Sequence, residues 1–412
     1  MARHFRKHWK KYTFGSIVFT LGGSYLTRKF RDRNVIREYC EEAKQYGEKG
    51  ISVLDRPKKV TVFLNPMANK MDAKIQFKKY AGPLFHLSGY DVTVVESEYE
   101  GQIRTLMGYI DPECDAIVVA GGDGTIMEVV NGLMRRWDVE KTRTIPIGIL
   151  PLGRENRFYS RFFSSRLSLS QTRRISEAAM DIIRGATVPI HMLQLEPESG
   201  KTLFALSSIH WGVFRDSLQI KDRFKLFGKF RLLMSHVRTV LRGWPGDYSL
   251  RLWFPASSRS SSVGTMPPDS QVANSPNSTT SEALNQTAVG RRKIEPTRLV
   301  ARRTEGWQER QLDVVGLHLC LEESASLEER LKTVVWPADL KKWDFIKQGW
   351  SASLGKNVPP VPGTLSVDSS QLVLHPQSGG VSWLNIDGEP YEAMPLSVTV
   401  LPSVIRVFTK QS

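Results

Sequence analysis

The sequence predicts two domains of different class, an α/β domain followed by an antiparallel all-β domain. From Lys58 to residue 188, apolar runs of strand length alternate with stretches of helical spacing, which is typical of a parallel sheet covered by helices. After Pro189 the helical spacing gives way to short runs of alternating apolar and polar residues, which favour antiparallel strands. We therefore expect a Rossmann-like domain over residues 58–188 and a β-sandwich with few helices over residues 189–408.

Four strands and three helices make up the pattern of the first domain. The expected strands are Lys59–Asn65, Asp91–Val95, Ala116–Ala120 and Ile145–Leu150, and the expected helices are Lys70–Ser88, Gly101–Tyr109 and Thr125–Arg136. Parallel sheets bind their ligands beyond the carboxyl ends of the strands. The turns Asn65-Pro66, Gly121–Thr125 and Pro151–Gly153 each follow a strand, so we expect them to share one edge of the sheet.

The turn Gly121-Gly122-Asp123-Gly124-Thr125 joins a buried strand to the start of a helix. Its glycines let a phosphate approach the backbone N–H groups, and the positive end of the following helix favours an anion. Asp123 is the acid of this turn and is placed to meet a magnesium ion or a hydroxyl proton. The alternative is a tight turn in which Asp123 only caps the helix.

The second domain carries six alternating runs, a basic insertion and a polar segment. The runs are Met192–Leu195, Leu203–Leu206, Ser249–Trp253, Val314–Leu321, Thr364–Leu374 and Leu396–Leu401. The insertion, Phe224–Leu241, has helical spacing and carries Lys225, Lys229 and Arg231, which we interpret as a solvated face or a face toward anionic lipid. Residues 256–304 are rich in Ser, Thr, Pro and Asn, and we expect a disordered loop there.

Residues 1–31 form a basic leader with eight Lys and Arg and no acidic residue. Its apolar centre, Phe14–Leu26, would rise roughly 20 Å as a helix, which is short of the roughly 30 Å hydrocarbon core. The arginines on both sides favour a mitochondrial import segment that stays as a membrane anchor. The alternative is a soluble basic helix.

The net charge of +15 does not indicate a nucleic-acid partner, because the leader supplies more than half of it. Cys40, Cys114 and Cys320 are scattered and indicate neither a disulfide framework nor a metal site. The eight histidines also lack metal-ligand spacing.

Six motifs in order resemble the diacylglycerol kinase catalytic-domain superfamily, which includes sphingosine kinases, ceramide kinases and bacterial lipid kinases. The motifs are Phe63–Pro66, Leu87–Thr93, Gly121–Thr125 with Glu128–Gly132, Ile149–Gly153, Arg215-Asp216 after Trp211-Gly212, and Ile386–Pro395. The resemblance runs from about Lys58 to Leu401. It implies an active site in the cleft between the two domains, with a nucleotide on one side and a lipid hydroxyl on the other.

The resemblance also implies a role for individual residues. The implied nucleotide-binding positions are Asn65, Pro66, Ser97, Gly121, Gly122, Gly124, Thr125 and Glu389. Asp123 and Asp387 occupy catalytic positions, and Asp123 has a second implied role in organising a metal ion. Asp216 occupies a substrate-binding position. Read without the resemblance, Asp216 is a helix cap and Asp387-Gly388 is a hairpin turn.

Two positions depart from the pattern of the superfamily. Met67–Lys70 replaces a stretch in which relatives have glycines, so the backbone there is less suited to approach a phosphate. Arg157 stands where many bacterial relatives have an acid. Either this branch arranges its metal differently, or Arg154 and Arg157 help to bind phosphates.

Taken together, these residues and the resemblance predict a lipid kinase that uses ATP and Mg²⁺. The implied products are lysophosphatidic and phosphatidic acid, made from mono- and diacylglycerol at the mitochondrial inner membrane, with the catalytic part facing the intermembrane space. One alternative, which can coexist with kinase activity, is a non-enzymatic subunit of the carrier-insertion translocase of that membrane. The other is a soluble metabolite kinase, because NAD kinases and phosphofructokinases share Gly-Gly-Asp-Gly.

Overall fold

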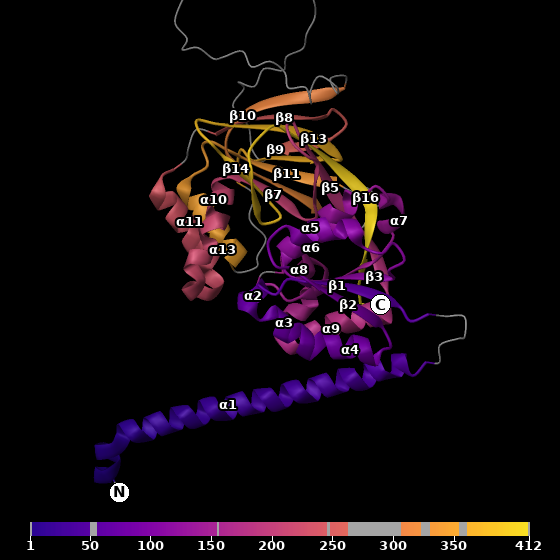
Figure 1. Ribbon diagram of the computed structural model, residues 1–412. Helices are drawn as coiled ribbons and strands as arrows, with labels where there is room; N and C mark the ends of the chain where they lie inside the picture. The colour runs from indigo at the N-terminus through magenta and orange to yellow at the C-terminus, as the bar shows by residue number, and fades with distance from the viewer. Residues whose placement is uncertain are drawn as a thin grey trace, which may run out of the picture. The chain divides into compact units, whose positions relative to one another are not determined.

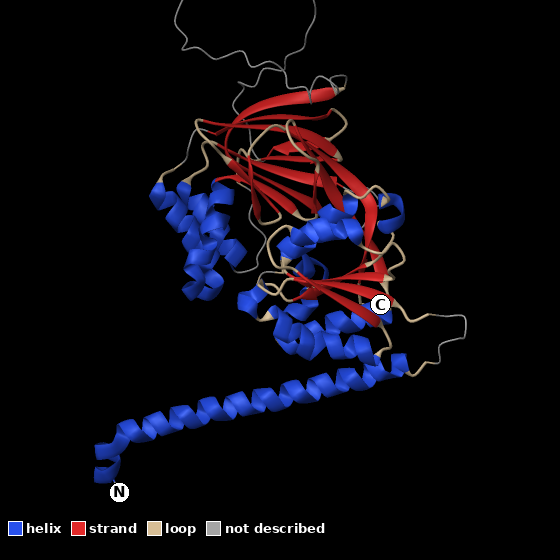
Figure 2. Cartoon of the chain, in the orientation of Figure 1, coloured by secondary structure: helices blue, strands red, loops and turns tan. Residues whose placement is uncertain are grey.

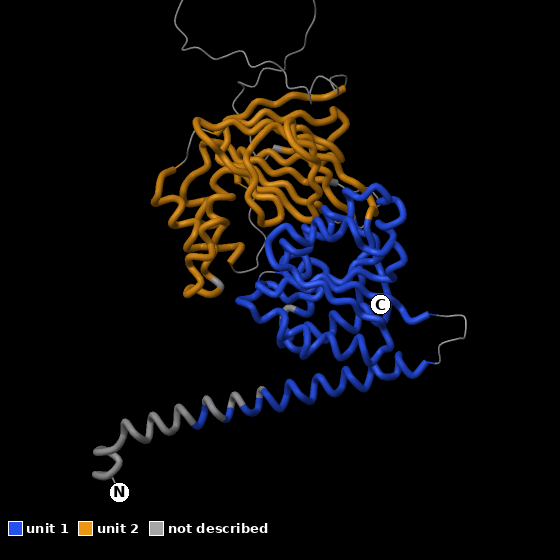
Figure 3. Tube along the Cα trace, in the orientation of Figure 1, with its two compact units in different colours: residues 1–190, 405–412 blue, residues 191–404 orange. Residues whose placement is uncertain are grey.

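The computed structural model divides into two compact units, residues 1–190 with 405–412 and residues 191–404 (Figure 3). The structure describes residues 2–49, 56–154, 156–244, 248–262, 306–322, 330–353 and 361–410. The chain passes between the units in two strands, β5 (Thr187–Pro197) and β16 (Leu396–Phe408). Each unit is built around its own sheet region.

Unit 1 contains a parallel sheet in the order β4-β3-β1-β2. Its strands are β1 (Lys59–Leu64), β2 (Asp91–Glu96), β3 (Ala116–Gly121) and β4 (Ile147–Pro151), and they confirm the four strands predicted from the sequence. β3 is buried along its whole length, as expected for a central parallel strand. Helices cover both faces of the sheet (Figure 2). This is the α/β layer architecture that the alternating pattern predicts.

The helices of unit 1 follow the strands as predicted, with one exception. They are α1 (Ala2–Gly47), α2 (Ala68–Met71), α3 (Ala73–Gln76), η1 (Phe77–Ala81), α4 (Gly82–Leu87), α5 (Gln102–Leu106), η2 (Met107–Tyr109), α6 (Asp123–Met134), α7 (Val139–Thr142), α8 (Arg157–Phe162), η3 (Ser164–Ser168) and α9 (Gln171–Arg184). The helix expected over Lys70–Ser88 begins later than predicted, because Asn69, Lys70 and Met71 have positive φ. From Ala73 to Leu87 the chain is helical without a gap, with a π-helical turn at Phe77–Ala81 between α3 and α4.

The carboxyl-terminal part of α1 is held against α9 by side-chain hydrogen bonds, one of which is also an ion pair. Tyr39 Oη donates to Glu177 Oε1 over 2.7 Å, and Arg184 Nη2 donates to Glu42 Oε1 over 2.8 Å. Burial and the adjacent carboxylate of Glu177 raise the pKa of Tyr39. Toward its start, α1 runs clear of the other helices of unit 1 (Figure 1). None of the helices in the described part of the chain has both the length and the apolar character that a membrane span requires.

Unit 2 is dominated by antiparallel strands, as the sequence predicts. They are β6 (Leu203–Ala205), β7 (Ser208–Gly212), β8 (Tyr248–Pro255), β9 (Arg259–Ser262), β10 (Trp307–Glu322), β11 (Arg330–Pro337), β12 (Leu365–Ser369), β13 (Gln371–Ser378), β14 (Trp383–Ile386) and β15 (Glu389–Glu392). The long strand β10 is central, because it pairs with β7, β8 and β11. β9 lies inside the segment expected to be disordered, so that expectation is wrong for Arg259–Ser262. The rest of the segment, from residue 263, lies outside the described residues.

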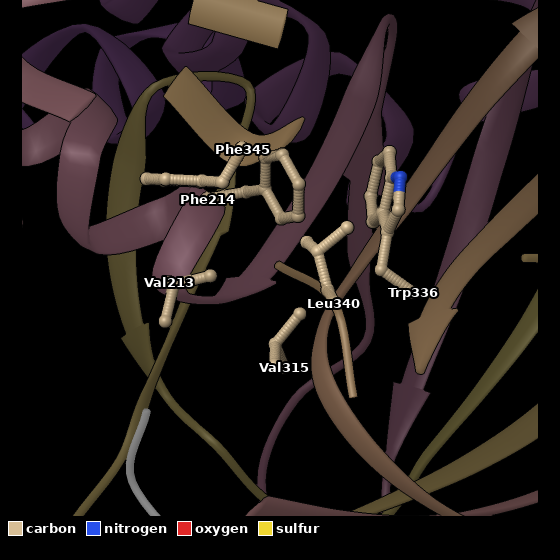
Figure 4. Packing of buried hydrophobic residues seen from close by; sticks show 6 residues of the cluster. All are labelled: Val213, Phe214, Val315, Trp336, Leu340 and Phe345. Atoms are coloured by element: carbon tan, nitrogen blue, oxygen red, sulfur yellow. The ribbon is translucent and has the colours of Figure 1, made fainter. Parts of the chain in front are cut away.

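A helical layer packs on part of the strands of unit 2. It consists of α10 (Val213–Ile220), η4 (Lys221–Phe230), α11 (Arg231–Arg242) and α13 (Lys342–Ser353). The basic insertion is therefore helical, as predicted, whereas α13 has no counterpart in the sequence prediction. Figure 4 shows the core between this layer and the strands, where the ring of Phe214 stacks on Trp336 at 3.9 Å and meets Phe345 edge-on at 5.0 Å.

Unit 1 is completed by residues that follow unit 2 in the sequence. In β16, Val407 pairs in parallel with Ile147 of β4. The N–H of Thr409 donates to the carbonyl of Ala186 over 2.9 Å, and the Arg406 guanidinium donates to Thr187 Oγ1. The parallel sheet of unit 1 is thus closed on the β4 side by a strand from residues 405–412.

Candidate functional site

The turn between β3 and α6 is shaped by close packing at its glycines. A Cβ added to Gly121 would lie 2.5 Å from Oγ1 of Thr125, so the Thr125 side chain packs directly over the turn. Gly122 precedes α6 in an extended conformation, and Asp123 is the first residue of the helix. The N-terminal amides of a 12-residue helix therefore lie at the carboxyl edge of the sheet.

The turn after β4 lies against this glycine turn. A Cβ on Gly153 would lie 2.3 Å from Cα of Gly122, which leaves no space for a side chain there. The Gly153 N–H donates to the Gly121 carbonyl over 2.8 Å. Asn156 closes the turn, because its side chain exchanges two hydrogen bonds with the backbone of Gly153. These contacts hold the two turns in one fixed arrangement.

The end of β1 joins the same edge through Asn65. Its Nδ2 donates to Thr125 Oγ1 over 3.3 Å, and its Oδ1 accepts the N–H of Met67 over 3.0 Å. Ser97 follows β2 and is buried, with its N–H on the carbonyl of Leu64. The predicted residues of unit 1 therefore gather at one edge, as expected for the ends of neighbouring parallel strands.

Asp123 accepts hydrogen bonds from the first turn of α8. The N–H of Arg157 lies 2.9 Å from Oδ2, and the N–H of Phe158 lies 3.1 Å from Oδ1. The carboxylate therefore caps α8, a contact that the simple capping alternative does not include. Because the donor is the backbone N–H of Arg157, any residue type other than proline at this position can make the same hydrogen bond to Asp123.

The loop after Asn65-Pro66 contains consecutive non-glycine residues with positive φ. The φ angles of Asn69, Lys70 and Met71 are 51°, 61° and 70°. Such conformations cost side-chain-bearing residues free energy, and they are found where the surrounding structure enforces them. The loop thus adopts a left-handed backbone conformation, although it lacks the glycines that the resemblance to the superfamily leads us to expect there.

The edge of unit 1 fits a nucleotide with a magnesium ion. Its glycines and helix amides suit phosphate oxygens, and Asp123 supplies a carboxylate in the same turn. Nucleotide-bound Mg²⁺ takes one or two protein carboxylates and completes its shell with water and phosphate. The described residues contain no cluster of three or more His, Cys, Asp or Glu, so a protein cage for a metal is not found there.

In unit 2, Asp387 joins the β14–β15 turn to the loop before β7. Its carboxylate accepts the N–H groups of Leu206, Ser207 and Ser208 at 2.5, 2.9 and 2.7 Å. Asp387 has a φ of 50° and Gly388 a φ of 106°, which a tight turn requires. Glu389 then begins β15, opposite Ile386. The Asp-Gly-Glu turn is therefore held in place by backbone donors.

Unit 2 also contains a cavity of about 330 Å³ around the start of α10. Its walls come from β7, α10, β8 and the stretch from the end of β13 to the start of β14: Trp211, Gly212, Arg215, Asp216, Tyr248 and residues 378–383. Gly212 turns the chain into α10 with a φ of 73°, and a Cβ there would lie 2.3 Å from the carbonyl oxygen of Val315. This close contact with β10 fixes the direction in which α10 begins.

The cavity combines an aromatic wall with charged groups. Trp211 is fully buried and lies edge-on to Tyr248 with ring centroids 5.3 Å apart. Arg215 donates to Asp216 Oδ1 over 3.0 Å and to Gln219 Oε1 over 2.7 Å, and its Nε is buried without a hydrogen-bond partner. Burial, with a smaller contribution from nearby Asp216, raises the pKa of Tyr248. The cavity therefore suits a polar, hydroxyl-bearing group with an apolar remainder.

The predicted site residues thus form two groups. Asn65, Pro66, Ser97 and the Gly121–Thr125 turn lie in unit 1, and Asp216, Asp387 and Glu389 lie in unit 2. Within unit 2, Asp216 lines the cavity, and Asp387 does not line it. Sequence reasoning missed Asn156, Tyr248 and the loop 378–383 as site residues. The Ser-Gly-Gly of that loop was the available signal, because it separates two strand patterns.

The sequence matches three known protein families. Residues 59–195 match the diacylglycerol kinase catalytic domain. Residues 206–412 match the C-terminal region of acylglycerol kinase. Residues 7–108 match the inner membrane protein import complex subunit Tim54.

Relatives extend over nearly the whole chain. The mitochondrial acylglycerol kinase of Homo sapiens is 33% identical over 417 residues, covering 98% of this chain and 94% of the relative. Its Mus musculus counterpart is 32% identical with the same coverage. Among solved structures, a putative diacylglycerol kinase from Bacillus anthracis has a TM-score of 0.53 at 17% identity, covering 86% of this chain and 98% of the other. At that identity the likeness supports the fold alone.

Proposed function

The chain belongs to the acylglycerol kinase family and is a lipid kinase, and on this premise we propose that it phosphorylates mono- and diacylglycerol. The substrate hydroxyl attacks the γ-phosphorus of ATP, the bond from that phosphorus to the β-phosphate oxygen breaks, and ADP leaves. The products are lysophosphatidic and phosphatidic acid. The observation that carries this proposal is the Gly121–Thr125 turn, whose glycines and helix amides lie at the carboxyl edge of a parallel sheet together with one carboxylate.

We assign the nucleotide to the edge of unit 1. The backbone of Gly122, Gly124 and Thr125 would cradle the phosphates, with Asn65, Pro66 and Ser97 on the neighbouring strand ends. Asp123 is either the acceptor of the hydroxyl proton or the carboxylate that holds Mg²⁺. When bound, Mg²⁺ would neutralise phosphate charge. The hydrogen bonds from Arg157 and Phe158 fix the orientation of the Asp123 carboxylate for either role.

We assign the glycerol group of the lipid to the cavity of unit 2. Asp216 and Tyr248 offer an acceptor and a phenol to glycerol hydroxyls, and Arg215 has a buried Nε still able to donate. Asp387 has a positioning role in this proposal, because it holds the Leu206–Ser208 loop that leads into β7 and Trp211. Glu389 keeps its expected nucleotide-binding role on the turn that Asp387 fixes.

The kinase assignment is tested by supplying the purified chain with labelled ATP and a panel of acceptors. We expect transfer to monoacylglycerol and diacylglycerol, and none to NAD. Transfer to NAD with inactive acylglycerols would favour the soluble metabolite kinase instead. Omission of Mg²⁺ should abolish transfer, and its return should restore it.

We further propose that the protein acts at the mitochondrial inner membrane, with its catalytic part in the intermembrane space. The basic leader and the matches to mitochondrial relatives support this location. The match of residues 7–108 to an import-complex subunit favours a second role in carrier insertion. An Asp123→Asn chain tested in cells that lack the protein separates the two roles. Restored carrier import without lipid phosphorylation would support the second role, and failure of import would tie it to catalysis.

A further inference from the structure

The helical layer of unit 2 ends in a group of exposed apolar side chains. Leu226 and Phe227 of η4 are 99% and 50% exposed, and Phe230 and Trp350 are 39% and 48% exposed. The rings of Phe230 and Trp350 stack at 5.5 Å, which joins the end of η4 to α13. We call these four residues the apolar tip. A fully exposed leucine that is followed in the chain by exposed aromatic rings is unusual on a protein surface.

The helices next to the apolar tip pack against each other. The Leu233 N–H donates to Ser353 Oγ over 3.1 Å, which links α11 to the end of α13. One turn farther along, His236 packs on Gly349, where a Cβ would lie 2.6 Å from the imidazole ring. Gly228 has a φ of 52° and interrupts η4 between Phe227 and Phe230. The tip is therefore connected to two helices, α11 and α13, that pack against each other.

The helices that carry the tip are rich in basic residues. Residues 221–242 and 341–353 contain ten Lys and Arg and two Asp. Arg223 and Lys225 flank the tip in η4 and are exposed, and Arg231 follows Phe230. Such a combination of apolar and cationic side chains matches an anionic lipid surface, where rings and leucine enter the acyl boundary and ammonium and guanidinium groups meet phosphates.

We propose that the apolar tip inserts into anionic membrane and holds unit 2 on the lipid surface. The tip follows the cavity closely in the chain, since α10 carries Arg215 and Asp216 and continues directly into η4. Insertion would keep the cavity near the bilayer that supplies its lipid. The benefit of insertion for catalysis rests on the proposed function. Membrane insertion itself can be measured without any catalytic assay.

Insertion is tested by an environment-sensitive fluorophore at Leu226→Cys in the full chain. A fluorophore at Trp137→Cys serves as the control, because Trp137 is 93% exposed in unit 1. Labelled wild type gives the background from Cys40, Cys114 and Cys320. We expect the emission at position 226 to shift to the blue on phosphatidylserine-containing vesicles, with little shift on pure phosphatidylcholine and none at position 137.

A second measurement compares vesicle binding of two variants with equal charge change. L226E/F227E should bind anionic vesicles at least about tenfold more weakly than wild type, because two apolar side chains lose their burial. Y109E/W137E replaces side chains that are 85% and 93% exposed in unit 1 and should bind as wild type does. Activity on a water-soluble short-chain acylglycerol should remain in both variants.

Three outcomes would overturn the inference. The label at position 226 could stay in water on bound vesicles, which would mean that another segment binds the membrane. It could become buried without vesicles as protein concentration rises, which would make a second copy the occupant. Both glutamate variants could lose binding equally. If the wild-type protein did not phosphorylate the short-chain acylglycerol, the kinase proposal would be contradicted, whereas the result on membrane insertion would still hold.

Discussion

The backbone N–H of Arg157 donates a 2.9 Å hydrogen bond to Oδ2 of Asp123. This contact links the first residue of α6 to the first residue of α8 across 34 positions of sequence. It resolves one part of the departure at position 157, where many bacterial relatives carry an acid. Residue 157 orients Asp123 through its backbone N–H, so this hydrogen bond is kept when an arginine replaces the acid.

Asp123→Asn should lower kcat for lipid phosphorylation by about 100-fold or more, because the charged acceptor is lost. Asparagine keeps one side-chain oxygen for the N–H groups of α8, so the free energy of unfolding should fall by only about 1 kcal/mol. Initial rates and thermal unfolding measured on the same preparation check both values. An active variant would remove Asp123 from the mechanism.

Gly153→Ala should lower kcat/KM for ATP by about tenfold or more. The new Cβ would meet the backbone of Gly122 at 2.3 Å, and backbone cannot move aside as a flexible side chain can, so the phosphate turn shifts. Gly108→Ala is the matched control, because a Cβ there meets nothing within 4 Å. Equal kinetics in the two variants would argue against a nucleotide at this turn.

Asp387→Asn should destabilise unit 2 by about 2–4 kcal/mol, because charge-assisted bonds to three N–H groups are weakened and the amide adds a competing donor. Denaturant unfolding measures this, with the exposed turn residue Asp339→Asn as the control. A variant of unchanged stability that has lost kcat would instead give Asp387 a direct catalytic role.

Tyr248→Phe should raise KM for the acylglycerol roughly five- to tenfold, since one hydrogen bond to a glycerol hydroxyl is lost. KM for ATP should stay constant, because Tyr248 lines the cavity of unit 2. Tyr109→Phe, at a site 85% exposed in unit 1, serves as the comparison. A rise in KM for ATP alone would move the lipid away from this cavity.

Unit 2 should lose stability as the pH falls from about 6.5 toward 4. Burial lowers the pKa of His236 to about 4, whereas the unfolded chain titrates near 6.5. Between these values the unfolded state binds more protons, so this histidine costs up to about 3 kcal/mol of stability at acid pH and nothing above pH 7.

The slope of unfolding free energy against pH tests this effect. His236→Phe should flatten the slope between pH 4 and 6.5, although burial of His318, whose pKa is also lowered to about 4, should leave part of it. A slope equal to that of wild type in His236→Phe would show that His236 is not buried in the neutral form.

Local patterns predicted the strands and the glycine turn well, because a buried parallel strand and the turn after it are encoded within a few residues. β3 and the turn after it are the clearest example. The expected helix over Lys70–Ser88 was wrong only at its start, since three successive left-handed residues delay the helix to Ala73. α13 was missed because its buried face, with Phe345, is defined by contact with α11 and Phe214.

The contacts of the candidate site were the least predictable from sequence. The donors to Asp387 lie about 180 positions away at Leu206, Ser207 and Ser208, and they use backbone N–H groups that any residue type supplies. Tyr248 meets Trp211 for a similar reason, because the two strands are brought together only by β10. Such contacts cannot be predicted from the composition of the sequence or from the spacing of its residues.

The strand that closes unit 1 has a consequence for how the chain is made. Val407 is buried and pairs with Ile147 of β4, yet 214 residues of unit 2 are synthesised before it. A nascent or truncated chain that stops before residue 405 leaves the β4 edge open, and open edges recruit other strands. The edge of unit 1 to which we assign the nucleotide would therefore be complete only after residues 405–412 are translated, and a premature stop in unit 2 would leave its sheet without this strand.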